Sequence, residues 1–122
     1  MNYFKYESSG VVKYTDDGWL MLIIDPDIVE YYSKLCEYWG IVFNKRGKTV
    51  PHITVCKDKF MEFPEYVDDY IGKRFEFTYT DQIRINDTHV WLDVYSQQLA
   101  NIRSKLSSYK LDQSFHITLG RF

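Results

Sequence analysis

The hydrophobic positions of the first half of the chain predict a strand, a helix and two more strands. Residues 19–24 form an unbroken apolar run, which is typical of a strand buried on both faces. Asp25 and Pro26 then suit the cap and first position of a helix over residues 26–39, whose apolar stripe follows spacings of three and four before Gly40 ends it. Short apolar segments predict further strands over residues 41–43 and 50–56.

The second half repeats this order. Residues 75–85 alternate between apolar and polar, with a break near Asp81, and a turn at residues 86–88 leads into a strand over 89–95, so the two strands form a hairpin. Ser96 suits the cap of a helix over 96–108, and a last strand covers residues 115–121. Elsewhere the pattern is weaker: it predicts a short edge strand over 11–14 and a short helix after Pro64.

The matched element order indicates an internal duplication within one domain, residues 1–122. Strand, helix and histidine-bearing strand occur in two repeats, roughly residues 19–57 and 89–122, and both opening strands carry a Trp-Leu pair, at Trp19-Leu20 and Trp91-Leu92. Two lobes related by a pseudo-twofold axis would place their last strands opposite each other. We therefore expect a two-lobed α+β architecture.

Each repeat ends in the same short motif, Pro51-His52-Ile53-Thr54-Val55 and Phe115-His116-Ile117-Thr118-Leu119. Side chains two apart on a strand share a face, so each motif presents one imidazole and one hydroxyl to a surface and branched apolar side chains to a core. Side by side, the two strands would form a pocket with two acid/base groups and two hydroxyls.

The paired His-x-Thr motifs resemble those of the 2H phosphoesterase superfamily. That superfamily includes RNA 2′,3′-cyclic phosphodiesterases of the LigT type, 2′-5′ oligoadenylate and cyclic-nucleotide phosphodiesterases, and phage proteins that destroy the cyclic nucleotide signals of CBASS immunity. The resemblance covers about residues 19–122 and is strongest over 116–121, where a glycine and an arginine follow the motif. It implies antiparallel sheets whose His-x-Thr strands face a central cleft, with the helices outside.

The resemblance also implies roles for six residues. His52 and His116 would be catalytic, as a general acid and a general base whose roles can exchange with substrate orientation, since an imidazole titrates near neutral pH. Thr54 and Thr118 would donate to the non-bridging phosphate oxygens. Lys57 and Arg121, each five residues after a histidine, would attract the anion, although strict alternation places them on the opposite face.

The expected function is metal-independent cleavage of a small cyclic nucleotide or oligonucleotide, at a 3′-5′ linkage through a 2′,3′-cyclic phosphate, as in a viral counter-defence enzyme. The motif after His52 lacks the Phe-Leu-Gly often found in the LigT branch. Two alternatives stay open. One is an enzyme that processes RNA 2′,3′-cyclic phosphate ends or 2′-5′ linkages, and the other is a non-catalytic nucleotide sponge.

The charge of the chain limits the kinds of binding partner that we expect. A formal net charge of −2 and a pI of about 5.9 offer no chain-wide basic field, so we expect a small nucleotide rather than long nucleic acid. No cofactor or metal site is expected, because each motif contributes one strong ligand and no carboxylate sits at ligand spacing.

The remaining expectations concern setting and individual side chains. We expect a cytoplasmic protein, a monomer or weak homo-oligomer, with no membrane span. Cys36 falls on the helix stripe and should be core, whereas Cys56 should share the face of His52 and Thr54. His89, outside the repeated motif, is interpreted as an exposed strand or turn residue.

Overall fold

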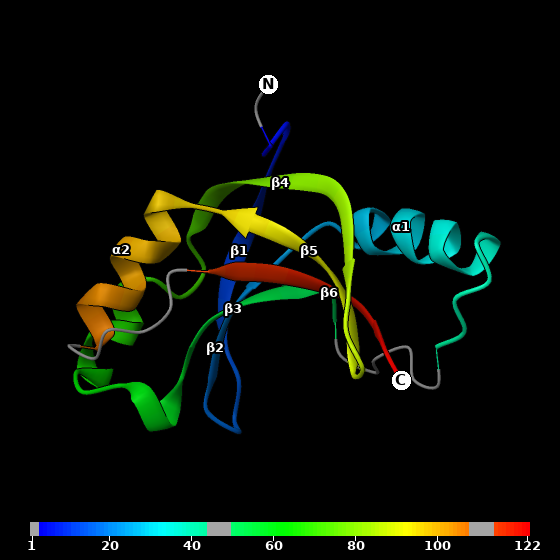
Figure 1. The fold of residues 1–122 in the computed structure, drawn as a ribbon. Coiled ribbons are helices and arrows are strands. Elements are labelled where there is room, and N and C mark those ends of the chain that lie inside the picture. The colour runs from blue at the N-terminus through cyan, green and yellow to red at the C-terminus, as the bar shows by residue number, and fades with distance from the viewer. Residues whose placement is uncertain (1–2, 44–49, 108–113) are drawn as a thin grey trace.

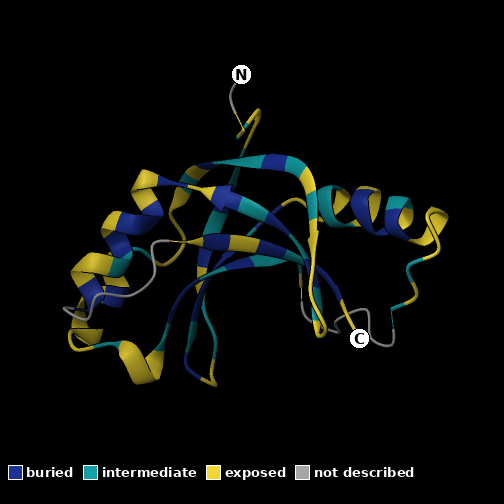
Figure 2. Ribbon diagram, in the orientation of Figure 1, coloured by how far each residue is buried: buried dark blue, intermediate teal, exposed yellow. Residues whose placement is uncertain are grey.

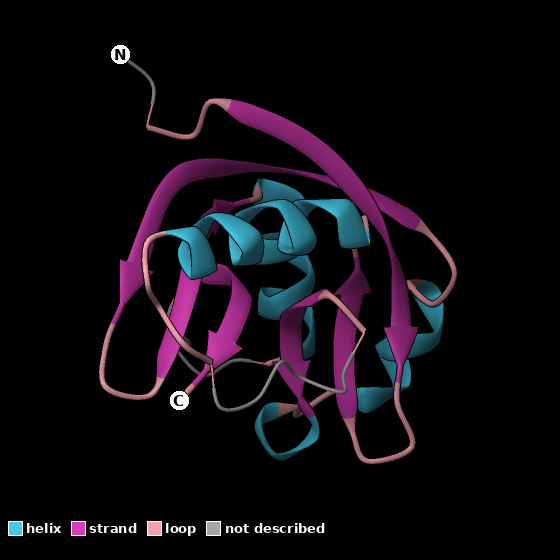
Figure 3. Ribbon diagram, turned by 90° about the vertical axis from the view of Figure 1, so that its right-hand side faces the viewer, coloured by secondary structure: helices cyan, strands magenta, loops and turns pink. Residues whose placement is uncertain are grey.

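The chain folds into one closed antiparallel β-barrel with a helix on either side. The computed structural model describes residues 3–43, 50–107 and 114–122. Within these ranges the strands are β1 (Tyr6–Tyr14), β2 (Trp19–Ile23), β3 (His52–Lys57), β4 (Arg74–Ile85), β5 (His89–Tyr95) and β6 (Phe115–Arg121). They are hydrogen-bonded in the order β1-β2-β3-β6-β5-β4, and β4 returns to β1. Figure 1 shows this arrangement, and Figure 3 shows the sheet curving round on itself.

The helices begin where the sequence predicts. Helix α1 (Pro26–Tyr38) is capped by the Asp25 carboxylate, which accepts from the backbone N–H of Asp27 at 3.0 Å, and it ends at Gly40, whose φ is +88°. Helix α2 (Gln97–Leu106) is capped by the Ser96 hydroxyl, which accepts from the N–H of Leu99 at 3.2 Å. Two 3₁₀ turns, Asp58–Phe60 and Pro64–Asp69, lie between β3 and β4.

The two-lobed architecture with outer helices is wrong, because β1 closes the sheet. Sequence patterning predicted only a short edge strand over residues 11–14, whereas β1 has nine residues and pairs with β2 along one edge and with β4 along the other. With β3 also bonded to β6, the strands of both repeats lie in a single barrel and have no cleft between separate sheets. An additional strand expected over residues 41–43 is also absent, since that segment has no regular structure.

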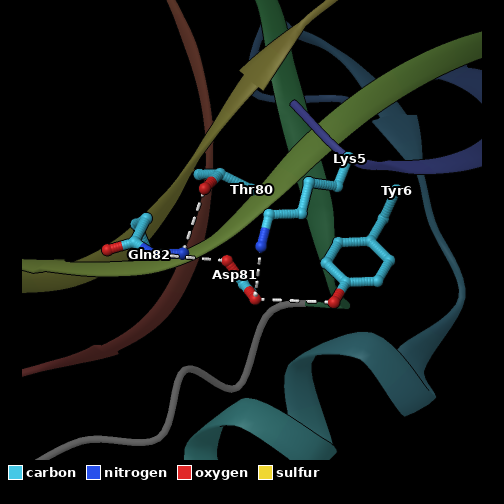
Figure 4. A network of polar contacts seen from close by, with 5 residues as sticks. All are labelled: Lys5, Tyr6, Thr80, Asp81 and Gln82. Carbon is cyan, nitrogen blue, oxygen red and sulfur yellow. Dashed lines mark hydrogen bonds and ion pairs between the residues drawn. The ribbon is translucent and has the colours of Figure 1, made fainter. Parts of the chain in front are cut away.

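Strand β4 contains a bend that the broken alternation near Asp81 had indicated. Tyr79 pairs with Val94 and Ile83 with Leu92, so β4 has three residues where β5 has one. The fully buried Thr80 hydroxyl accepts from the N–H of Gln82 at 3.0 Å. Beside it, Asp81 accepts from the Tyr6 hydroxyl at 3.4 Å and lies 3.5 Å from the Lys5 ammonium, as Figure 4 shows. These contacts hold the bend against the start of β1.

The core combines the inner faces of the strands with one face of each helix. Its fully buried side chains are Leu20, Leu22, Ile53, Val55, Val90, Leu92, Leu99, Leu106 and Ile117. Figure 2 shows the helices buried on the side toward the sheet and exposed on the other. Cys36 belongs to this core, as its place on the helix stripe predicted. Within the described ranges, no helix combines the length and apolar character that crossing a membrane requires.

Candidate functional site

The two His-x-Thr strands lie side by side in the barrel. Strand β3 pairs antiparallel with β6, and Ile53 is opposite Ile117. Both isoleucines are fully buried. Their neighbours in each strand therefore point to the other face, which places His52 across from Thr118 and Thr54 across from His116.

This register brings both imidazoles within reach of one small group. Directly opposite side chains in an antiparallel pair have Cβ atoms about 5 Å apart, and diagonal neighbours are about 7–8 Å apart. His52 and His116 are such diagonal neighbours, because each lies one residue before the central isoleucine pair on its own strand. An imidazole reaches several ångströms beyond its Cβ, so a phosphate between them can contact both rings.

A β-bulge follows each motif at the same position. On β3, Met21 pairs with Thr54 and Leu20 with Cys56, which leaves Val55 as the extra residue. On β6, Trp91 pairs with Thr118 and Val90 with Gly120, which leaves Leu119 as the extra residue. An extra residue reverses the alternation that follows it.

The bulges settle where the two basic residues point. After the reversal Lys57 and Arg121 lie on the histidine face, not on the opposite face that strict alternation would give. The same reversal turns Cys56 toward the core, where the residue is 3% exposed, so it does not share the face of His52 and Thr54 as expected, although it still contributes to the cavity wall. Burial raises the pKa of the Cys56 thiol, partly offset by Arg103, and a protonated thiol is a poor nucleophile.

Each helix supports the bulge of the other repeat. Ser33 on α1 donates its hydroxyl to the carbonyl oxygen of Leu119 at 3.0 Å. Arg103 on α2 donates through Nε to the carbonyl oxygen of Val55 at 2.7 Å. The same guanidinium donates to the carbonyl oxygens of Thr54 at 3.3 Å and of Ser114 at 3.2 Å, so it joins β3 to the segment that precedes β6.

The histidine face forms the wall of a cavity of about 640 Å³. Figure 1 shows β3 and β6 running between α1 on one side and α2 on the other. All six residues singled out from the sequence line this cavity, and the structure adds four informative ones, Trp19, Phe60, His89 and Arg103. Among the described lining residues the lysine and arginine side chains are Lys57, Arg103 and Arg121, against a single carboxylate, Glu30. The cavity is therefore locally cationic in a chain of net charge −2.

The ring of His52 has one nitrogen occupied. Its Nδ1 lies 2.7 Å from the carbonyl oxygen of Val50. A carbonyl only accepts, so Nδ1 carries the hydrogen and Nε2 is the nitrogen left to exchange a proton with a ligand. His52 is half-buried in the cavity wall.

The surroundings of His116 differ from those of His52 and change its pKa. The His116 side chain is exposed within the cavity, but desolvation by the surrounding wall lowers its pKa from the usual 6.5. The charge of His89 lowers this pKa further, and the carboxylate of Asp93 opposes both effects. Asp93 is the cross-strand partner of His116 on β5 and also accepts from the Trp91 indole and the Tyr3 hydroxyl, each at 3.0 Å. His116 is therefore mostly neutral at pH 7, which is the state a general base requires.

The sequence did not place His89, Arg103 or Trp19 at the site. His89 begins β5, in keeping with the strand or turn position expected for it, and it reaches the cavity wall because β5 is the neighbour of β6. The matched order of the elements contained a usable signal, but aligning Trp19-Leu20 with Trp91-Leu92 displaced the comparison by two residues. In the structure Leu92 pairs with Ile117 as Leu22 pairs with Ile53, so Trp19 is equivalent to His89.

No trio of His, Cys, Asp or Glu side chains in the described part of the chain is arranged to hold a metal ion. Comparison with protein-family models, with curated proteins and with solved structures finds no match to this chain. The resemblance to 2H phosphoesterases therefore stays a prediction that rests on the motifs themselves.

Proposed function

We propose that this chain is a phosphodiesterase that cleaves a small nucleotide with His52 and His116 as its acid/base pair and without a catalytic metal. One observation carries the proposal: two imidazoles and two hydroxyls, from equivalent positions in the two repeats, lie on one wall of one cationic cavity. Proton transfer, charge stabilisation and anion attraction can all be assigned to these side chains.

The reaction is an internal displacement at phosphorus. A general base removes the proton of a ribose 2′-hydroxyl, the 2′-oxygen forms a bond to the adjacent phosphorus, and the bond from phosphorus to the 5′-oxygen breaks. A general acid protonates the departing 5′-oxygen. The products are a 2′,3′-cyclic phosphate and a free 5′-hydroxyl, and one proton leaves the substrate at one ring and returns at the other.

The unequal environments of the two rings favour one assignment. The lowered pKa of His116, caused first by desolvation, makes it the base that takes the 2′-hydroxyl proton. His52 then acts as the acid, because its Nδ1–H is held by the Val50 carbonyl and Nε2 delivers the proton to the leaving oxygen. Thr54 and Thr118, half-buried beside the rings, donate to the non-bridging oxygens as negative charge develops there.

The cavity suits a small nucleotide. Sites for small molecules typically enclose about 300–1,000 Å³, and the cavity here, about 640 Å³, lies within that range. Its cations attract phosphate, whereas the acidic chain as a whole does not favour long polyanions. Together with the motif resemblance, these features favour a cyclic di- or trinucleotide with a 3′-5′ linkage as the substrate.

The test is incubation of the protein with EDTA and a panel of cyclic di- and trinucleotides, followed by mass spectrometry. We expect a product that carries a 2′,3′-cyclic phosphate, and no cleavage of the matched 2′-deoxy analogue, which lacks the attacking hydroxyl. Intact substrates throughout the panel would contradict the proposal. Cleavage confined to RNA ends would assign end processing instead, and release of unmodified ligand on denaturation would assign a sponge.

A further inference from the structure

The two ends of the cavity are related by the duplication but differ in chemistry. At one end Lys57 pairs across the strands with Trp19, and its ammonium lies 4.4 Å from the centre of the indole ring. At the other end Arg121 pairs with His89. The aromatic partner at the first end is thus replaced by an imidazole at the second.

His89 is held on a rigid turn. The side-chain oxygen of Asn86 accepts from the backbone N–H groups of Thr88 at 2.9 Å and of His89 at 2.8 Å. The Thr88 hydroxyl donates to the same oxygen at 3.1 Å and lies 2.6 Å from Nδ1 of His89. The Thr88 hydroxyl thus occupies Nδ1, and Nε2 is the ring nitrogen of His89 that can contact a ligand.

The Arg121 side chain is also placed to contact a ligand. Its side chain is exposed, and it makes no ion pair within the described ranges. The one carboxylate in the described cavity lining, Glu30, lies 2.9 Å from the Lys34 ammonium on α1. A guanidinium and an imidazole on adjacent strands, with no carboxylate committed to either, make a site for an anion.

From these contacts we infer that His89 and Arg121 bind a second phosphate of the substrate, one nucleotide away from the phosphate that reacts between His52 and His116. Arg121 follows Thr118 by three positions on β6, which is at most about 10 Å along the strand because the bulge at Leu119 shortens it. The second phosphate would therefore lie close to the first along the same substrate. The inference rests on the proposed function. It narrows the substrate class to nucleotides with at least two phosphates.

The experiment uses deoxydinucleotides, which the proposed reaction cannot cleave. Binding of dApdA is compared by calorimetry with binding of the same dinucleotide carrying a terminal 5′- or 3′-phosphate. We expect one terminal phosphate to tighten binding by about tenfold, in line with a charge-assisted hydrogen bond of about 1.5 kcal/mol. His89→Ala and Arg121→Ala should each abolish most of this gain.

Lys13→Ala is the matched control, since it removes an exposed cation on β1 outside the cavity lining and should leave the gain intact. Equal affinity for all the dinucleotides in the wild-type protein, no binding of any of them, or an unchanged gain in His89→Ala would overturn the inference. Cleavage of ribonucleotides without a gain from the terminal phosphate would reject this second site alone. A gain without any cleavage would reject the proposed function and keep the site.

Discussion

The buried hydroxyl of Ser33 donates to the carbonyl oxygen of Leu119, the extra residue in the bulge of β6, at 3.0 Å. Arg103 does the same for Val55, the extra residue in the bulge of β3, at 2.7 Å. Each repeat thus supplies the donor for the bulge of the other. This exchange links the two halves of the barrel and supports the bulges after which Lys57 and Arg121 turn toward the histidines.

Ser33→Ala should destabilise the fold by roughly 1–3 kcal/mol, because it leaves the Leu119 carbonyl without the donor that the side chain supplies. Urea denaturation measures the free energy of unfolding. Ser104→Ala, at an exposed position on α2, is the matched control and should change it by less than about 0.5 kcal/mol. Equal losses in the two variants would show that the Ser33 contact does not support the bulge.

In an Arg103→Lys variant, the lysine should not restore the contacts that arginine makes. One ammonium cannot reproduce the separate bonds that the guanidinium makes to Val55, Thr54 and Ser114, so we expect a loss of about 2 kcal/mol or more in unfolding free energy. Activity should fall with it, because the bonds set the spacing of the two histidine strands. Lys13→Met, which removes an exposed cation on β1, is the control. A fully active and stable Arg103→Lys protein would rule out this role.

His52→Ala and His116→Ala should each lower turnover of the substrate found in the panel by about 10² to 10⁴. The double variant should be scarcely slower than the worse single variant, because acid and base act in one concerted proton transfer. Circular dichroism should show that all three variants keep the barrel. A variant with near-normal turnover would remove its histidine from the mechanism.

The pH dependence should follow the pKa of His116, which desolvation lowers from 6.5. Activity should fall on the acid side with a midpoint below 6.5, where the base becomes protonated. Asp93→Asn should move that midpoint to lower pH, because the carboxylate raises the pKa of His116, and His89→Gln should move it to higher pH, because the charge of His89 lowers that pKa. Shifts in the same direction for both variants would contradict the assignment.

The free energy of unfolding should also depend on pH through His116. Since the folded-state pKa of His116 lies below 6.5, the folded chain binds fewer protons than the unfolded chain between the two values. The free energy of unfolding should therefore increase as the pH rises through that window and decrease as the pH falls through it. His116→Gln should flatten this part of the curve. An unchanged slope in the variant would assign the pH dependence to other groups.

Gly120→Ala should be strongly destabilising, because a Cβ at this position would overlap the ring of Phe43, which stacks on Phe122. Overpacking of this kind costs typically about 1–3 kcal/mol. Phe43→Leu in the Gly120→Ala background should recover part of the loss, since the smaller side chain leaves room. Thermal unfolding measures both. No recovery in the double variant would place the strain elsewhere.

Local features of the site were predictable because they depend on neighbours in sequence. Helix caps at Asp25 and Ser96, and the shared faces of His52 with Thr54 and of His116 with Thr118, follow from side-chain chemistry and strand geometry within a few residues. The two copies of the motif indicated that these strands belong together. The sequence alone therefore determined which four side chains would share the central wall.

Other features were decided only by contacts between distant segments. Closure of the barrel depends on β1 pairing with β4, over 60 residues away, and the bulges at Val55 and Leu119 depend on how β2 and β5 register against the histidine strands. A one-residue change in register reverses every later side chain, and no local pattern reports it. For that reason the directions of Lys57, Arg121 and Cys56, and the place of His89 beside Arg121, emerged only from the tertiary structure.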